Sequence, residues 1–204
     1  MAFIITAEHL KKIAGRSTPL MPALAEWINK ICPTYEIDTP QEYAHFLAQA
    51  CHETASFSTL RELGPASYFK KYDGRADLGN KVPGDGLKFK GRGIFQTTGR
   101  NNYLKLGITK GSRDLFINHP EYLEQPEYAV WSACEFWKGK GFTDIANHAD
   151  SDLLKKKIYL NSKLTAFKTI DVSPLEYITR GINGGVNGLD ERKKFYIRAK
   201  SVLV

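Results

Sequence analysis

The sequence predicts a mainly α-helical fold with little β structure. Three observations indicate it: apolar residues recur at helical spacing in several segments, helix start and stop signals flank those segments, and a glycine-rich stretch separates them. The 204 residues, 42% apolar and 25% charged, suffice for one domain with a sizeable core or for two small lobes. We therefore expect a single domain over residues 1–204.

Two helices are expected in the first quarter of the chain. The first ends at Pro33, and its apolar positions are Leu20, Leu24, Trp27, Ile28 and Ile31. In the second, Thr39 can cap the helix, Pro40 suits its first position, and Glu42 can complete a capping box. Its apolar side should carry Tyr43, Phe46, Leu47, Ala50, Cys51 and Thr54. It should fade near residues 56–58.

Two more helices are expected in the second half. Over residues 126–137 the packing positions are Ala129, Trp131, Ala133, Cys134, Phe136 and Trp137, and Gly139 can end that helix. Another helix should begin near Asp190. Between them, the run Lys155–Lys157 predicts a solvated helix face, with a contact to a polyanion as the alternative.

Residues 64–103 have a different character, because glycines and prolines break any long helix there. Between them stand the aromatic residues Tyr68, Phe69, Tyr72, Phe89 and Phe95. Glycine lets the backbone approach a ligand closely, and aromatic rings can stack on it. We expect this segment to line a groove; an irregular loop with its own small core is the alternative.

The formal charge of +7 favours an anionic partner such as nucleic acid, a membrane surface or a cell wall. No apolar run approaches the roughly 20 residues of a membrane-spanning helix, and the first residues lack the basic start of a signal peptide. We expect synthesis in the cytoplasm and no stable membrane insertion. Cys51 and Cys134 lie in apolar stretches, which favours buried thiols. No Cys-x-x-Cys pair or His/Cys cluster occurs, so we expect no metal and no cofactor.

Glu53 and Glu62 are candidates for a pair of catalytic carboxyl groups. Glycoside cleavage needs one protonated carboxyl to donate to the leaving oxygen, and one ionised carboxylate that attacks or activates water. Glu53 lies near the end of a largely apolar helix, where desolvation favours the protonated form. An unbroken helix would place Glu62 on the opposite face, so the helix must end between the two. Taken alone, such a pair is more typical of solvated surface.

The stretch Gly91–Tyr103 favours the catalytic interpretation of Glu53 and Glu62 over the surface interpretation. Its polar side chains Gln96, Thr98 and Asn102 can hold a water molecule and the hydroxyl or acetamide groups of a sugar. A phosphate cradle is excluded, because no Gly-x-x-x-x-Gly-Lys-Ser/Thr pattern occurs.

Three ordered motifs together resemble glycoside hydrolase family 19, which contains plant-type chitinases and phage endolysins. They are His52-Glu53-Thr54, the Gly-Arg-Gly-x-x-Gln-x-Thr-x-x-Asn-Asn-Tyr stretch from Gly91, and Ile182-Asn183-Gly184-Gly185. The segment Tyr72–Asn80, followed by Pro83-Gly84-Asp85-Gly86, is similar to the endolysin branch in particular. The resemblance covers roughly residues 40–200.

The resemblance implies roles position by position. Glu53 stands where the family has its general acid, and Glu62 where it has its general base. Thr98 matches the Ser/Thr whose hydroxyl helps to hold the attacking water. The implied substrate-binding residues are His52, Gln96, Asn102, Tyr103, Asn183 and Arg192. Two departures favour the endolysin branch: Asn187 stands where plant chitinases have a Glu, and three cysteines cannot form their several disulfides.

The resemblance therefore implies a lysozyme-like, helix-rich fold with two lobes around a substrate groove. The expected activity is that of a monomeric endolysin, which cuts the β-1,4 glycan bond of peptidoglycan with inversion once the membrane is breached. Chitinase activity is the alternative within the enzyme class. A non-catalytic wall-binding or nucleic-acid-binding protein is the alternative outside it, but both carboxylates remain and no nucleic-acid motif occurs.

Overall fold

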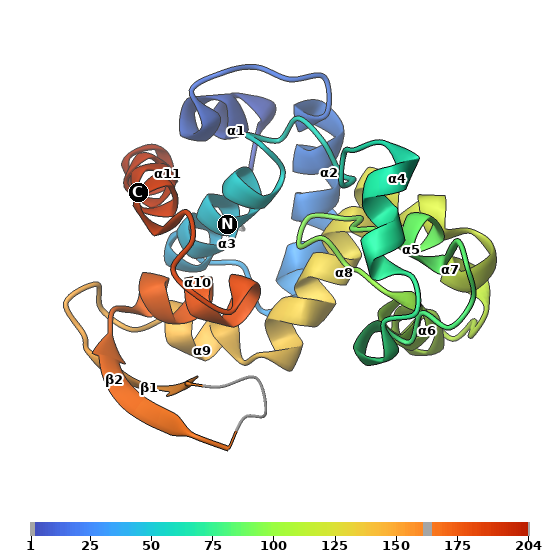
Figure 1. The fold of residues 1–204 in the computed structure, drawn as a ribbon. Coiled ribbons are helices and arrows are strands. Elements are labelled where there is room, and N and C mark those ends of the chain that lie inside the picture. Colours follow the sequence, from blue (N-terminus) through green and yellow to red (C-terminus); the bar gives the residue numbers. More distant parts are fainter. Residues whose placement is uncertain (1–2, 161–164, 204) are drawn as a thin grey trace.

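The computed structural model describes residues 3–160 and 165–203, and helices dominate it (Figure 1). The elements are α1 (Ala7–Ala14), α2 (Met21–Ile31), η1 (Cys32–Tyr35), α3 (Pro40–Glu53), α4 (Ala66–Phe69), η2 (Lys70–Tyr72), η3 (Ala76–Leu78), α5 (Asp85–Lys88), α6 (Arg100–Thr109), α7 (Leu115–Asn118), η4 (Pro120–Glu124), α8 (Pro126–Gly139), α9 (Phe142–Ala146), β1 (Leu154–Tyr159), β2 (Phe167–Val172), α10 (Pro174–Asn183) and α11 (Leu189–Leu203). None of the helices in the described ranges is long and apolar enough to span a membrane.

Helix α3 is the centre of the larger lobe. The predicted capping box is confirmed: the Thr39 hydroxyl accepts from the Glu42 N–H, and the Glu42 carboxylate accepts from the Thr39 N–H. Its middle, from Glu42 to Cys51, is buried on every side, so α3 is enclosed rather than amphipathic. Helix α11 packs along it, and α1 and α9 also contact it (Figure 1).

The protein has two lobes, as predicted. The larger core surrounds α3, whereas a second core consists of Phe89, Tyr103, Phe116, Leu123 and Trp131. Helix α8 joins the lobes: Trp131 packs in the second core and Trp137 in the first. In Figure 1, α4 to α7 lie together on one side of α8.

A turn of left-handed residues follows directly after helix α3. Residues 55–57 all have positive φ (50°, 63° and 58°) although none is glycine, a conformation that costs roughly 1–2 kcal/mol per residue. Local bonds hold it: the Phe57 N–H donates to the Thr54 hydroxyl (3.0 Å), and the Thr18 hydroxyl donates to the Phe57 carbonyl (2.6 Å). The Phe57 side chain is fully buried. The helix therefore ends at Glu53, slightly earlier than expected, and the chain is free to turn before Glu62.

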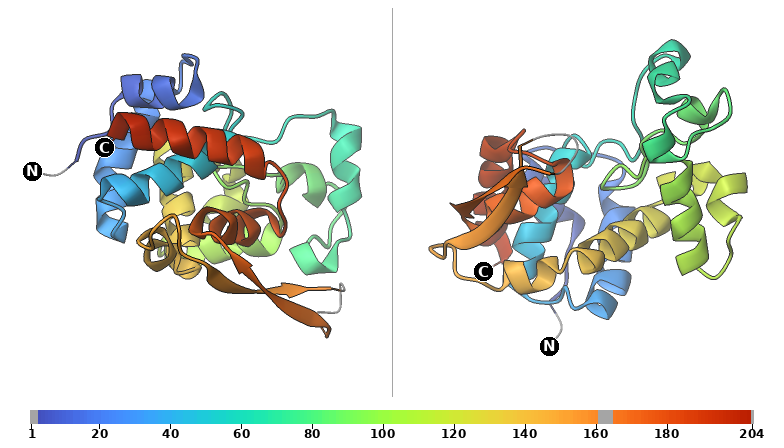
Figure 2. Two further views of the ribbon diagram at one scale, coloured as in Figure 1. Left: turned by 90° about the vertical axis from the view of Figure 1, so that its left-hand side faces the viewer. Right: turned by 60° about the horizontal axis from the view of Figure 1, so that its bottom comes forward.

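The prediction of a helix at Lys155–Lys157 is wrong, because these residues form part of strand β1. It pairs antiparallel with β2, from Leu154 opposite Val172 to Tyr159 opposite Phe167. The hairpin projects from the larger lobe (Figure 2). Burial alternates along β1, where Leu154, Lys156 and Ile158 are half-buried and the residues between them are exposed, as in a strand with one covered face. The run of three lysines hides this alternation in the sequence.

The prediction of buried thiols is confirmed. Cys32, Cys51 and Cys134 are all buried and free, and the sulfur atoms of Cys32 and Cys134 lie 3.6 Å apart.

Candidate active site

Glu53 lies at the last position of α3 and is held from the opposite end of the chain. Its Oε1 accepts a hydrogen bond from Arg192 Nη2 of α11 at 2.5 Å. The Glu53 side chain is 18% exposed, whereas that of Arg192 is almost completely buried. The carboxyl group is thus anchored on one oxygen but still reaches the surface.

A polar chain behind Glu53 fixes this arginine. Arg192 Nη1 donates to Gln49 Oε1 (2.5 Å), and Gln49 Nε2 donates to the Thr179 hydroxyl of α10 (3.0 Å). Gln49 stands four residues before Glu53, so both face α11 from one side of α3. The buried Arg192 is therefore a support for Glu53, which corrects its predicted role as a direct substrate contact.

His52 is enclosed by the turn between α10 and α11. Its Nδ1 lies 2.5 Å from Glu191 Oε2. A Cβ on Gly188 would lie 2.1 Å from the imidazole ring, so only glycine permits this approach. His52 keeps some exposure, and a substrate contact for it stays a prediction.

Asn183 shapes the same turn. Its Oδ1 accepts from the Gly185 N–H (2.8 Å), and its Nδ2 donates to the Asn187 carbonyl (2.7 Å). Gly184 adopts φ 78° to end α10. The Ile-Asn-Gly-Gly motif thus builds the loop that covers His52, and substrate binding by Asn183 stays a prediction.

Glu62 is held by two neutral donors. The Tyr72 hydroxyl donates to its Oε1 (2.9 Å) and the Gly91 N–H to its Oε2 (3.1 Å). The Glu62 N–H in turn donates to the Gly91 carbonyl (2.8 Å). Burial and the neighbouring Glu62 carboxylate raise the pKa of Tyr72, which keeps its proton available for this bond.

The glycine-rich motif places its polar side chains next to Glu62. A Cβ on Gly91 would lie 2.7 Å from Gln96 Oε1 and 3.3 Å from Glu62 Oε2, so both groups converge on that glycine. The Thr98 hydroxyl donates to the Gln96 carbonyl (2.8 Å), and Asn102 Nδ2 donates to the Thr98 carbonyl (2.7 Å). Glu62, Gln96, Thr98 and Asn102 therefore form one connected cluster.

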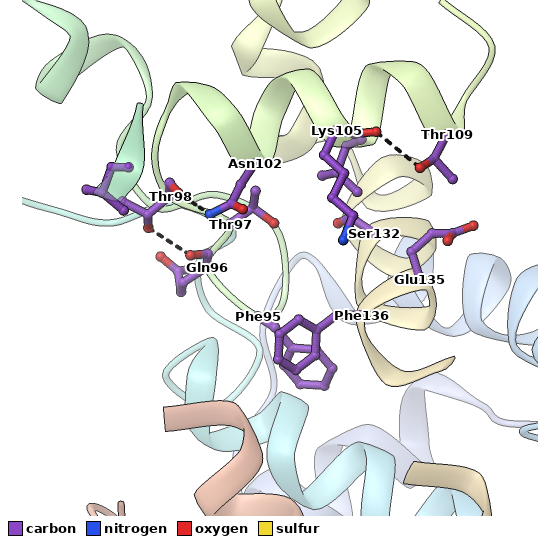
Figure 3. Close-up of a pocket in the computed structure, with 12 residues that line it drawn as sticks. Phe95, Gln96, Thr97, Thr98, Asn102, Lys105, Thr109, Ser132, Glu135 and Phe136 are labelled. Carbon is purple, nitrogen blue, oxygen red and sulfur yellow. Dashed lines mark hydrogen bonds between the residues drawn. The ribbon is translucent and has the colours of Figure 1, made fainter. Parts of the chain in front are cut away.

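A cavity of about 320 Å³ opens beside this cluster, between α6 and α8. Figure 3 shows Gln96, Thr98 and Asn102 on one side of it and Lys105 reaching toward Ser132 on the other. The rings of Phe95 and Phe136 form an apolar wall, with centroids 5.7 Å apart. Polar groups above an apolar wall suit a sugar with hydroxyl and acetamide substituents.

Tyr103 does not line the cavity. Its ring is completely buried in the second core, where its hydroxyl donates to the Lys90 carbonyl (2.6 Å) and accepts from Arg92 Nη1 (3.0 Å). Burial raises its pKa. This corrects its predicted role: Tyr103 supports the glycine-rich segment from below and has no surface for a substrate.

Sequence reasoning missed three supporting residues. The sequence predicts Tyr72 only as one of several aromatic residues lining a groove, and it does not point to Gln49 or Thr179 as supports of the site. The spacing of Gln49 to Glu53 carries a usable signal, because residues four apart share one helix face. Nothing in the local sequence points to Thr179, which lies 130 residues from its partner.

Comparison with known proteins agrees with the family resemblance and with the fold. A glycosyl hydrolase family 19 domain-containing protein from Haemophilus influenzae is 28% identical over 183 residues, which cover 76% of this chain and 76% of the relative. No protein-family model matches the chain.

Solved structures share the fold. Chitinase C from Streptomyces griseus matches with a TM-score of 0.65 at 15% identity, covering 99% of this chain and 93% of the chitinase. A bacterial family 19 chitinase matches with a TM-score of 0.64 at 17% identity, covering 98% and 95%. The homologue and the fold together show that the chain is a glycoside hydrolase related to family 19.

Proposed function

We propose that the chain is an endolysin-type peptidoglycan hydrolase. It cleaves the β-1,4 bond between N-acetylated amino sugars by single displacement with inversion. Glu53 is the general acid, Glu62 is the general base, and Thr98 positions the attacking water.

The different bonding of the two carboxyl groups carries this proposal. Both oxygens of Glu62 accept hydrogen bonds from neutral donors, which stabilise the anion that a base requires. Glu53 has only Oε1 occupied, by Arg192, and among residues 3–160 and 165–203 nothing bonds to its Oε2. The ion pair with Arg192 occupies Oε1, so the free Oε2 is the oxygen that takes up a proton as the substrate covers the site and then transfers it. Two carboxyl groups with different surroundings are what acid and base catalysis needs.

The steps follow from this assignment. Glu53 Oε2 gives its proton to the glycosidic oxygen as the bond between that oxygen and the anomeric carbon breaks. A water held by Thr98 and Gln96 attacks the opposite face of the sugar and gives a proton to Glu62. One sugar leaves with a new hydroxyl and the other with an inverted anomeric centre. Proton exchange with solvent then restores both carboxyl groups.

Peptidoglycan is favoured over chitin as the substrate by charge and by motif. The chain carries a formal charge of +7, which suits the anionic envelope of bacteria. The segment Tyr72–Asn80 resembles the endolysin branch, and Tyr72 bonds to the proposed base. We further propose that the enzyme is made in the cytoplasm and reaches the wall after the membrane is breached.

Chitin is the second candidate, because the solved structures with this fold include chitinases. The deciding experiment is digestion of purified peptidoglycan and of chitin side by side, with mass spectrometry of the fragments. Muropeptides with cut glycan strands are expected. Products from chitin alone would establish the second candidate instead. NMR of freshly released ends should show inverted anomers, and retained anomers would refute single displacement.

A further inference from the structure

The β1–β2 hairpin has an outer face that the larger core does not use. Strand residues alternate between faces, and Lys156 points toward the body, where its Nζ lies 3.6 Å from the centre of the Tyr177 ring. The outward residues of β1 are therefore Lys155, Lys157 and Tyr159, and Tyr159 pairs with Phe167 of β2.

The end of the hairpin at Tyr159 and Phe167 carries a group of exposed apolar side chains. Tyr159 is 49% exposed, Leu160 60% and Phe167 50%. The two rings lie 6.3 Å apart and form one patch on the outer face. Leu160 follows Tyr159 and lies at the same end of the hairpin, on the opposite face. Single exposed apolar residues are common, but a cluster on a projecting element marks an interaction surface.

The hairpin carries cations on both faces near this end: Lys157 lies on the outer face, and Lys168, opposite Ile158, lies on the other. The two strands contain four lysines and one aspartate. Lys155 pairs with Asp171. Lys157 and Lys168 have no carboxylate partner among the described residues, and Lys157 Nζ lies 3.7 Å from the centre of the Phe167 ring. The hairpin thus presents apolar groups together with ammonium groups that no acid neutralises.

The geometry favours a lipid surface over a sugar polymer. A sugar stacks on an open, flat ring face, but the rings of Tyr159 and Phe167 are inclined by 67° and Lys157 covers one face of Phe167. Aromatic and leucine side chains flanked by lysines are typical of segments at the bilayer interface.

We propose that the hairpin end docks on an anionic lipid bilayer, a role beyond the proposed hydrolysis. Tyr159, Leu160 and Phe167 enter the headgroup region, and Lys157 and Lys168 bind anionic headgroups. We name these five residues the hairpin patch.

Vesicle sedimentation of the full chain tests the proposal. One set of vesicles contains phosphatidylglycerol and phosphatidylethanolamine, and the other contains phosphatidylcholine alone. The protein should pellet with the first set and much less with the second. Tyr159→Ser, Leu160→Ser and Phe167→Ser combined should weaken binding by at least about ten-fold. The matched control combines Ile197→Ser of α11 with Ile108→Ser of α6, which removes exposed apolar groups elsewhere and should bind as wild type.

The lysines are tested separately. Lys157→Gln with Lys168→Gln should weaken binding to the anionic vesicles by about 25-fold at low salt, since each lysine near an anionic leaflet contributes roughly five-fold. The difference should shrink as salt rises. All variants should melt at the wild-type temperature and hydrolyse soluble glycan at the wild-type rate, because the hairpin patch lies outside the site.

A fluorescent label reports entry into the bilayer. The three native cysteines are buried, so Leu160→Cys can be labelled selectively with an environment-sensitive dye. Its emission should shift to the blue with anionic vesicles, whereas a label on Ile197→Cys should not shift. The proposal is wrong if the wild type ignores anionic vesicles, or if the serine variant binds them normally. It is equally wrong if the hairpin patch governs pelleting with insoluble glycan instead of with vesicles.

Discussion

Arg192 and Glu53 form a hydrogen-bonded ion pair across 139 positions of the sequence, with Arg192 Nη2 2.5 Å from Glu53 Oε1. The arginine is buried and the glutamate reaches the surface. The pair fixes the carboxyl group at the end of α3 by anchoring it to α11. The position of the proposed acid thus depends on the docking of the last helix.

Glu53→Gln should abolish hydrolysis and leave the fold intact. The amide keeps the shape, and its oxygen can still accept from Arg192, but it has no proton of the required acidity. A loss on the scale of general acid catalysis, about 10²–10⁴-fold, is expected in a turnover assay on peptidoglycan. Glu62→Gln should cost nearly as much. Glu8→Gln, the same change at an exposed position of α1, is the control. A folded Glu53→Gln enzyme within tenfold of wild type would remove Glu53 from the role.

Arg192→Met should destabilise the protein as well as inactivate it. It leaves Glu53 and Gln49 without their donor, and loss of one partner of a buried pair costs several kcal/mol. Because Glu53 keeps solvent contact, we expect at most about 3 kcal/mol, measured by urea denaturation. In a Glu53→Gln background Arg192→Met should lower the free energy of unfolding by less, since a neutral amide loses a weaker interaction when the arginine is removed. Equal costs in both backgrounds would show that the two residues are not coupled.

Tyr72→Phe should slow hydrolysis with little effect on melting temperature. The change removes the donor to Glu62 Oε1 and keeps the ring. A hydrogen bond to a charged group contributes roughly 1.5–3 kcal/mol, so kcat should fall by about ten-fold or more. Tyr68→Phe, on the exposed neighbouring ring, should behave as wild type. A rise in KM at unchanged kcat would place Tyr72 against the substrate instead of the base.

Thr98→Ala should lower kcat by about 10²-fold or less, the scale of one group that positions a reactant. The hydroxyl bonds to the Gln96 carbonyl and borders the cavity beside Glu62. Thr98→Ser retains that hydroxyl and should restore most of the rate. If Thr98→Ser is as slow as Thr98→Ala, the rate depends on the methyl group of Thr98 and not on its hydroxyl.

Stability should fall as pH drops from about 6.5 to 4, through His45. Burial lowers the pKa of His45 from 6.5 to about 4, with Lys200 adding to the effect and Asp150 opposing it. Neither ring nitrogen has a hydrogen-bond partner within residues 3–160 and 165–203, and the ring centroid lies 4.4 Å from that of Tyr196. Below pH 6.5 His45 becomes protonated in the unfolded chain, whereas in the folded chain it stays neutral until about pH 4. Proton uptake by the unfolded chain therefore lowers the free energy of unfolding across that pH range. Each pKa unit corresponds to about 1.4 kcal/mol.

His45→Phe should flatten the pH dependence of the free energy of unfolding between pH 6.5 and 4. His119→Asn, a change to an exposed histidine, should leave it unchanged. Urea denaturation at closely spaced pH values gives both curves. An unaltered slope in His45→Phe would assign the acid sensitivity to other groups.

The sequence by itself determined the helix boundaries that have local signals, and it predicted the two carboxyl groups. The capping box at Thr39 and the stop at Pro33 work through neighbours within one helical turn, so they can be read without knowledge of the fold. Glu53 and Thr98 stand in two of the three ordered motifs, each of which is local, and the prediction for Glu62 follows from the resemblance that those motifs carry.

Only the tertiary structure decided which groups support those residues. Arg192 and Tyr103 look like groove residues in the sequence, yet packing of α11 and of the second core buries them. Lys155–Lys157 became a strand because β2 pairs with it, and residues 55–57 turned left-handed because Thr18 and Thr54 hold them. In each case the deciding partner is distant along the chain or belongs to another element, and its contribution appears only after the chain has folded.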